Sequence, residues 1–192
     1  MRSSITFELA GLSDNWVMSI SRFLTAALVL SSAATAFAQA PAAGPQVSSS
    51  MVLFGNAKNN VVKSADQIPA DLWNWRPTPK VRTFGELFAH IADGQYEFCG
   101  AALEGKPVDK GIEKTAKSKA EVVAALTQAF AYCEAGYKKM TESSAAETVT
   151  FFGRPMTRIS IMDFNAAHTM EHYGNLVTYM RLKDMVPPSS KQ

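Results

Sequence analysis

The stretch TFGELFAHIAD at residues 83–93 carries both the start of a helix and a helical repeat of apolar residues. Thr83 and Glu86 have the spacing of a capping box, in which each side chain accepts a hydrogen bond from the other residue's backbone N–H. Apolar residues then recur at intervals of three and four, as in a helix that buries one face: Phe84, Leu87, Phe88 and Ile91. The stretch therefore predicts a helix that begins at Thr83 and ends before Gly105 and Pro107.

Three more segments have helical periodicity, and little of the chain has the alternation of a strand. A second capping box, Ser118 with Glu121, opens one of them. We expect these helices at residues 50–67, 118–140 and 160–182. Residues 141–158 look irregular, with a short hairpin around Gly153 as the alternative. Four helices of this length predict an all-α fold, a four-helix bundle.

The N-terminal segment has the three parts of a secretory signal peptide: a basic start, a short apolar core and the cleavage pattern Ala36-Phe37-Ala38. We therefore assign residues 1–38 to a signal peptide cleaved after Ala38, and expect a periplasmic or secreted protein. Acidic residues upstream of Met18 fit poorly in such a leader and indicate that translation starts at Met18. The apolar core is shorter than the roughly 20 residues that cross a bilayer. No stable membrane insertion is expected after cleavage, and an uncleaved anchor is the alternative.

The rest of the chain is expected to form one domain with two short ends. Residues 39–49 are rich in alanine and proline and are predicted to be a flexible leader. The bundle is expected at residues 50–186, followed by a tail at residues 187–192. The net charge of +2 is small and no lysine or arginine cluster is present, which argues against nucleic acid as a partner.

All three histidines of the chain fall on predicted helices. His168 and His172 are four residues apart, so they lie one turn apart on one face of the last helix. His90 lies on the inward side of the helix at residues 83–104. Because a bundle brings such faces together, we predict that the three imidazoles bind one divalent metal ion. The alternative is that the histidines are only hydrogen-bonded core residues.

The ligand type limits the metal and the kind of site. Imidazole suits zinc, nickel, iron and copper, and we expect zinc, nickel or iron. Three protein ligands leave a position for water or substrate, as in catalytic sites. Glu86, Asp93 and Asn165 each lie one turn from a histidine and are candidates to accept its second N–H. The alternative is that Glu86 only caps its helix and Asp93 faces water.

The two cysteines, Cys99 and Cys133, lie 16 and 15 residues after the starts of their predicted helices. If these helices are parallel, both thiols lie at nearly the same height, and the connection at residues 104–117 is long enough to return along a helix. Export makes a disulfide chemically possible. We predict a Cys99–Cys133 disulfide, with buried free thiols as the alternative.

Residues 83–93 and the stretch AHTMEHYGN at residues 167–175 resemble the second and last helices of the DinB/YfiT-like superfamily. The stretches RPTP at residues 76–79 and VPPS at residues 186–189 are also similar to that family, and the resemblance covers about residues 50–190. It implies a four-helix bundle with a long crossover between helices 2 and 3. It also implies a metal held by three histidines, which correspond to His90, His168 and His172, and it allows a homodimer.

Characterised members of that superfamily include thiol S-transferases, and a mycothiol-dependent isomerase is similar. The resemblance therefore implies a metal-dependent transferase or hydrolase that acts on a small molecule through a metal-activated thiol or water. We expect its cleft to be lined by Trp73, Trp75 or Phe151, which lie near helix ends. The known thiol cofactors are cytoplasmic, so the leader keeps open a non-catalytic periplasmic metal-binding or stress-related role.

Overall fold

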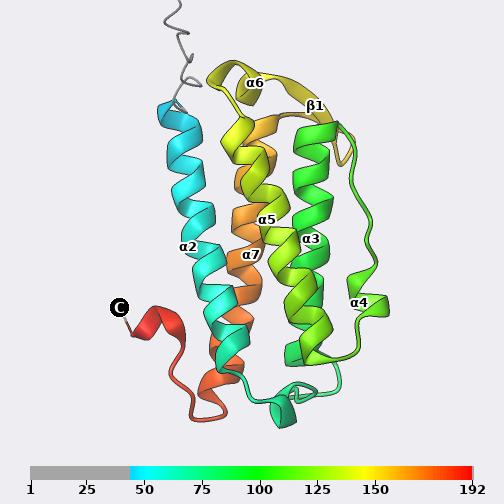
Figure 1. Cartoon of the computed structure of the whole chain (residues 1–192), viewed down its shortest axis with the longest axis vertical. Coiled ribbons are helices and arrows are strands. Elements are labelled where there is room, and N and C mark those ends of the chain that lie inside the picture. The colour runs from blue at the N-terminus through cyan, green and yellow to red at the C-terminus, as the bar shows by residue number, and fades with distance from the viewer. Residues whose placement is uncertain (1–43, 192) are drawn as a thin grey trace, which may run out of the picture. The chain divides into compact units, whose positions relative to one another are not determined.

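The computed structural model describes residues 44–191, which form a bundle of four long helices (Figure 1). The long helices are α2 (Pro45–Gln67), α3 (Phe84–Glu104), α5 (Lys119–Lys139) and α7 (Arg158–Arg181). The short elements are η1 (Ala70–Leu72), α4 (Ile112–Thr115), α6 (Glu142–Ala146), β1 (Thr148–Phe151), β2 (Arg154–Thr157) and η2 (Pro188–Ser190). The predicted all-α bundle is confirmed. The predicted signal peptide lies outside the described residues.

The chain order makes α3 and α5 parallel. After α3 ends, a long connection containing α4 returns along the outside of the bundle to the end at which α3 began (Figure 1). α3 packs against both α5 and α7, and α2 packs against α7 and α5. The predicted crossover between the second and third long helices is therefore present. Within the described part of the chain, no helix combines the length and hydrophobicity that a bilayer span requires.

Both predicted capping boxes form. The Thr83 hydroxyl accepts from the Glu86 backbone N–H at 3.1 Å, and the Glu86 carboxylate accepts from the Thr83 N–H at 2.8 Å. Ser118 and Glu121 make the same pair of bonds at the start of α5. α3 ends at Gly105, whose φ of 76° is the left-handed conformation that glycine adopts without steric cost. Local sequence signals thus determine where these helices begin and end.

The predicted boundary at the N-terminal end of the bundle was too late. α2 begins at Pro45, so the last five residues of the expected flexible leader are helical. Proline suits the first helical position because it lacks the N–H that would otherwise be unsatisfied. Val47 is fully buried, and its backbone N–H donates to the Glu142 carboxylate at 3.0 Å. These contacts involve residues far away in the sequence, so the composition of residues 39–49 alone does not reveal them.

The C-terminal tail also belongs to the folded unit. Pro187 and Pro188 are buried, and η2 packs against α2. The Tyr173 hydroxyl donates to the Ser189 hydroxyl at 2.8 Å and accepts from the Ser189 backbone N–H at 3.0 Å. The segment between α5 and α7 forms α6 and an antiparallel hairpin in which Thr148 pairs with Thr157. Of the two alternatives for residues 141–158, the hairpin is therefore the one observed.

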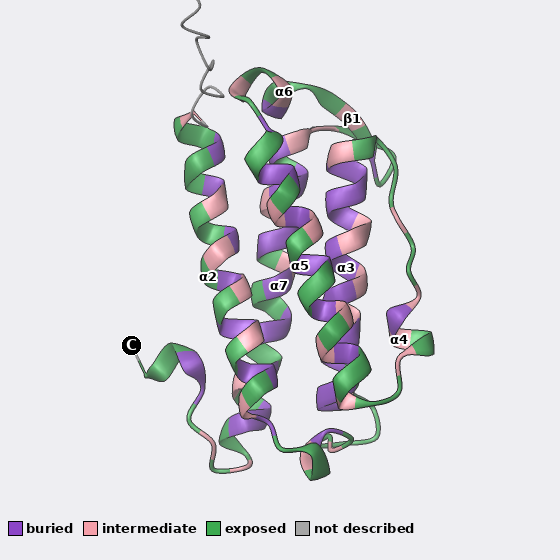
Figure 2. Ribbon diagram, in the orientation of Figure 1, coloured by how far each residue is buried: buried purple, intermediate pink, exposed green. Residues whose placement is uncertain are grey.

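Buried side chains line the faces that the four long helices turn toward one another (Figure 2). Phe54 on α2 contacts Phe130 and Tyr137 on α5, with ring centroids 5.9 and 5.1 Å away. Trp73 is buried and stacks on Phe88 at 5.1 Å. The core therefore extends through the bundle, and α3 packs directly against α7, the two helices that carry the histidines.

A disulfide joins Cys99 on α3 to Cys133 on α5, with Cα atoms 5.5 Å apart. Both cysteines are fully buried, and the Asn165 amide nitrogen on α7 lies 3.4 Å from Cys99 Sγ. Because α3 and α5 are parallel, Cys99 and Cys133 lie at the same height, as predicted from their distances to the starts of the two helices. The cross-link therefore ties together the two helices that the long crossover connects.

We predict that unreduced, denatured protein takes up no thiol alkylating reagent and that reduced protein takes up two equivalents, as measured by mass. Replacing both cysteines by serine is expected to lower the free energy of unfolding in urea by about 2–4 kcal/mol, because the cross-link restricts the unfolded chain. The Cys133→Ser single variant serves as the control for the added hydroxyls. An alkylation count that reduction leaves unchanged would show that no disulfide forms.

Candidate metal centre

The structure brings the three histidines together. One ring nitrogen from each of His90, His168 and His172 lies within 4.8 Å of the other two. His168 Nε2 is 3.0 Å from His172 Nε2 and 3.3 Å from His90 Nε2. The nitrogens come from α3 and from consecutive turns of α7, as the spacing predicted. Their separations suit coordination of a single ion.

Close packing of α3 on α7 holds the His168 ring in place. A Cβ atom at Gly94 would lie 2.8 Å from Cε1 of His168, so the imidazole occupies space that a side chain at position 94 would fill. On its other side the ring meets Phe98, with centroids 4.9 Å apart. Glycine at position 94 and the aromatic ring of Phe98 therefore determine where this imidazole lies.

Burial favours the neutral form of His168 and His172. Burial is the largest cause that lowers the pKa of His168 to about 3, and electrostatic interactions with His172, His90 and Arg82 contribute to this lowering. Burial is also the main cause that lowers the pKa of His172. Because metal coordination requires the unprotonated ring, neutral imidazoles are the form that can bind a cation near pH 7.

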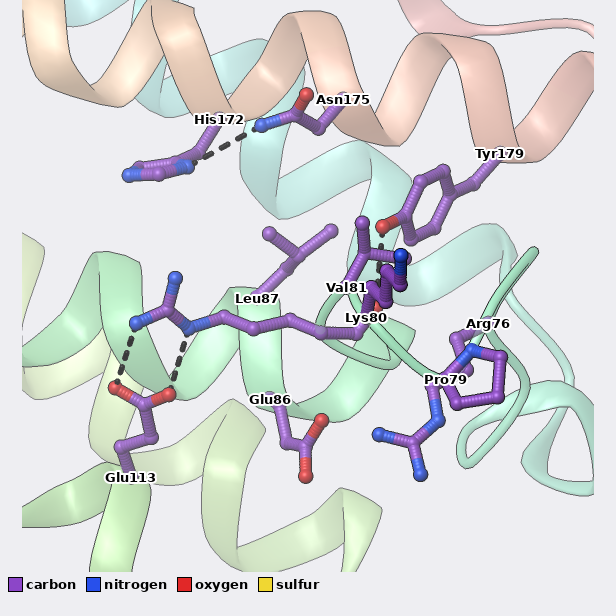
Figure 3. A pocket seen from close by; sticks show the side chains of 11 residues that line it. Arg76, Pro79, Lys80, Val81, Glu86, Leu87, Glu113, His172, Asn175 and Tyr179 are labelled. Atoms are coloured by element: carbon purple, nitrogen blue, oxygen red, sulfur yellow. Dashed lines mark hydrogen bonds and ion pairs between the residues drawn. The ribbon is translucent and has the colours of Figure 1, made fainter.

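His90 is oriented by a carboxylate from the crossover. Its Nδ1 lies 3.1 Å from Glu113 Oε2, and Arg82 Nε donates to Glu113 Oε1 at 2.6 Å (Figure 3 draws the ion pair). When Nδ1–H donates to the carboxylate, His90 Nε2 carries a lone pair that faces the other two histidines. Burial would raise the pKa of Glu113, but the hydrogen bonds and charges of Arg82 and His90 outweigh it and lower this pKa.

The three residues predicted to support the histidines have different roles. Within residues 44–191, Asp93 makes no hydrogen bond to a histidine: its carboxylate accepts from the backbone N–H groups of Ile112 and Glu113 at 2.8 and 2.9 Å, and so positions the first turn of α4. Glu86 caps α3. Asn165 donates to the Gln95 side chain at 2.8 Å and lies beside the disulfide. The prediction that these three residues hydrogen-bond to the histidines was therefore wrong.

Sequence reasoning missed Glu113 and Asn175. Glu113 is 23 residues from His90, in a connection with no helical periodicity, so nothing local indicates the contact. The Asn175 amide lies 3.4 Å from Nδ1 of His172 (Figure 3). Its spacing of three residues on α7 is one at which helical side chains meet, and that signal would have found it.

The donor set fits a divalent cation. With its Nδ1 proton directed at Glu113, His90 presents a lone pair to His168 Nε2, which also faces His172 Nε2. Buried His168 Nδ1 has no partner among residues 44–191, so no hydrogen bond there prevents Nε2 from acting as a ligand. A hydrogen bond between two of these nitrogens needs an N–H on one of them, whereas a cation bound by all three histidines would use a lone pair from each.

A pocket of about 520 Å³ adjoins His172 (Figure 3). It is lined by Arg76, Pro79, Lys80, Val81, Arg82, Glu86, Leu87, Glu113, His172, Asn175 and Tyr179. The expected lining by Trp73, Trp75 or Phe151 was wrong. These rings pack inward instead: Trp73 on Phe88, Trp75 on Tyr179, and Phe151 on Phe98. Burying these large aromatic rings is more favourable than exposing them in a cleft.

Comparison with solved structures shows the same fold in other bacterial proteins. A DinB-like protein from Bacillus subtilis is 20% identical, with a TM-score of 0.60 over 72% of this chain and 93% of that one. A DinB-like protein from Bacillus cereus is 17% identical, with a TM-score of 0.63 over 73% and 95%. At these identities the likeness concerns the fold.

An enzyme of known activity has the same fold in part of its chain. The mycothiol-dependent maleylpyruvate isomerase is 12% identical, with a TM-score of 0.57 over 68% of this chain and 60% of its own. The present chain thus spans less than two thirds of the isomerase.

The sequence itself was also compared with curated proteins and with family models. No curated protein sequence matched. The family model that matches describes the DinB superfamily and covers residues 53–176, which is more than half of the chain and includes all three histidines. The chain therefore belongs to the DinB superfamily.

Proposed function

We propose that this DinB superfamily protein binds one divalent cation, of zinc, nickel or iron, through His90, His168 and His172, and catalyses a transfer or hydrolysis on a small molecule there. The observation that carries the proposal is the convergence of three imidazoles within 4.8 Å beside an open pocket. When bound, such an ion supplies Lewis-acid chemistry, which favours the deprotonated form of a coordinated thiol or water.

The residues around the site would hold the ligands and limit access to them. Glu113 and Arg82 fix the orientation of His90, and Asp93 holds Glu113 through the first turn of α4. Gly94 and Phe98 close the side next to His168. The pocket reaches His172, so a substrate would approach from that direction.

A small thiol as co-substrate is supported by the shared fold with the mycothiol-dependent isomerase. The second candidate is a non-catalytic metal-binding or stress-related role in the periplasm. The buried Cys99–Cys133 disulfide favours it, because disulfides persist in oxidising compartments, and so supports export by a signal peptide cleaved after Ala38. Both candidate functions include metal binding, but only the first includes catalytic turnover.

Tag-free protein is expected to contain about one divalent ion per chain by elemental analysis, and His168→Ala is expected to lose at least nine tenths of it. Removing one of three ligands leaves too few protein donors for tight binding. Met170→Ala is the matched control, because Met170 is exposed on the same helix between the two histidines. Full metal content in His168→Ala would rule out the three-histidine centre.

The same proteins test catalysis. Zinc-loaded protein is expected to accelerate the addition of cysteine to maleate, in which the thiolate sulfur bonds to one carbon of the double bond and the neighbouring carbon takes up the proton. EDTA-treated protein and His168→Ala are expected not to accelerate it. If metal-bound protein accelerates the reaction of maleate with neither cysteine nor water as the nucleophile, the result favours the non-catalytic role.

Glu113→Ala is expected to weaken metal binding by about 10–100-fold, because it removes the carboxylate that orients His90. Glu113→Gln is expected to recover part of this affinity, since its carbonyl oxygen still accepts from Nδ1–H. Competition with a chromogenic chelator measures the affinities. Glu171→Gln removes a charge next to His172 without a hydrogen bond to any histidine, and should leave affinity within about twofold. Equal losses in Glu113→Ala and Glu171→Gln would mean that charge alone matters.

We predict that metal-free protein loses stability as pH falls from about 6.5 to about 3 because of His168. Its pKa is about 3 in the folded protein, against about 6.5 when unfolded. In this window the unfolded chain binds a proton that the folded protein does not, so acid favours unfolding. Urea unfolding of EDTA-treated protein at several pH values should show a shallower dependence in His168→Gln. Identical pH dependence in both proteins would contradict the neutral, buried ring.

A further inference from the structure

We infer that the pocket beside His172 binds an oxyanion-bearing small molecule, whose carboxylate or phosphate pairs with Arg76 and Lys80. This inference rests on the proposed function and gives its substrate class. The pocket's volume of about 520 Å³ lies in the range that holds small organic ligands. Its polar lining is unlike the apolar lining of most such pockets, so charge is the feature that selects the ligand.

The charges that line the pocket do not cancel. Three cations and two carboxylates face it. Glu113 is bound by Arg82 and His90, and Glu86 accepts from the Thr83 backbone N–H. Arg76 and Lys80 have no ion-pair partner within residues 44–191. Arg76 and Lys80 are therefore cations outside any ion pair, and the three cations and two carboxylates leave the lining one net positive charge. The planar fork of the Arg76 guanidinium suits a carboxylate or phosphate.

The loop that carries these cations is fixed before any ligand binds. Pro77 and Pro79 restrict its backbone. The Trp75 carbonyl accepts from the Phe84 N–H at 3.1 Å, and the Tyr179 hydroxyl donates to the Arg82 carbonyl at 3.1 Å. A loop that is already ordered loses little conformational entropy when a ligand binds, which favours affinity.

The position of the cations orients the ligand. Arg76 and Pro79 lie at one end of the pocket, and His172 and Glu113 lie at the other (Figure 3). Leu87 and Val81 add apolar surface to the lining. A ligand whose oxyanion pairs with Arg76 and Lys80 would thus extend a short body toward the histidines, where the proposed reaction occurs.

The experiment is an NMR titration of EDTA-treated protein with succinate and, separately, with inorganic phosphate, at constant ionic strength. Succinamide is the uncharged control ligand. We compare wild type with Arg76→Gln/Lys80→Gln and with Arg154→Gln/Lys63→Gln, which removes the same charge from exposed residues that have no ion pair. Saturable shifts at the Leu87 and Asn175 amides are expected, weakened at least tenfold in the pocket variant and less than twofold in the control variant.

Equal weakening in the two double variants, or no saturable shift with either anion, would overturn the inference. Succinate binding without phosphate binding identifies a carboxylate, and the reverse identifies a phosphate; either supports the site. Zinc content is measured on wild type and the same variants before EDTA treatment. Zinc bound without anion binding overturns the pocket assignment and leaves the metal centre intact. Anion binding by a wild type that holds no zinc supports the pocket and contradicts only the proposed metal function.

Discussion

The contact between α3 and α7 at Gly94 is the constraint on which the candidate site depends. With no side chain at position 94, the His168 ring enters the space between the helices and meets His90 and His172. The same contact removes the imidazoles from water, which lowers the pKa of His168 and His172. One ring nitrogen of each histidine thus lies within 4.8 Å of the other two. The packing of α3 on α7 therefore produces the arrangement of ligand atoms that could hold a metal ion.

The long crossover contributes to the site as well as to the topology. α4 is only one turn long, yet the Asp93 carboxylate binds its first two backbone N–H groups and places Glu113 against His90. Arg82, which precedes α3, binds the same carboxylate from the other side. A segment that returns the chain along the bundle thereby orients a ligand on the helix it passes. The Cys99–Cys133 disulfide stabilises the pair of helices that this crossover connects.

Sequence patterns predict the parts of this structure that depend on interactions between residues close together in the chain. Capping boxes and apolar spacing locate α3 and α5, and helical spacing places His168 above His172 on one face. The start of α2, the role of Glu113 and the lining of the pocket depend on contacts between residues far apart in the chain. Val47 is tied to Glu142, for example, across 95 residues. Asn175 is the exception, because its spacing from His172 was visible in the sequence.

In the proposed function, the groups that would bind a metal ion lie apart from the groups that would select a substrate. The histidines lie on rigid helices whose positions are determined by core packing, whereas Arg76 and Lys80 lie on the loop before α3. Substitutions of Arg76 and Lys80 would alter the pocket's charge, whereas the hydrogen bonds that lead from this segment to His90 run through Arg82 and Glu113. Proteins with the same bundle could therefore share a histidine site and differ in the charge of this pocket. In the proposed function of this chain, the loop rather than the bundle would determine which substrate binds.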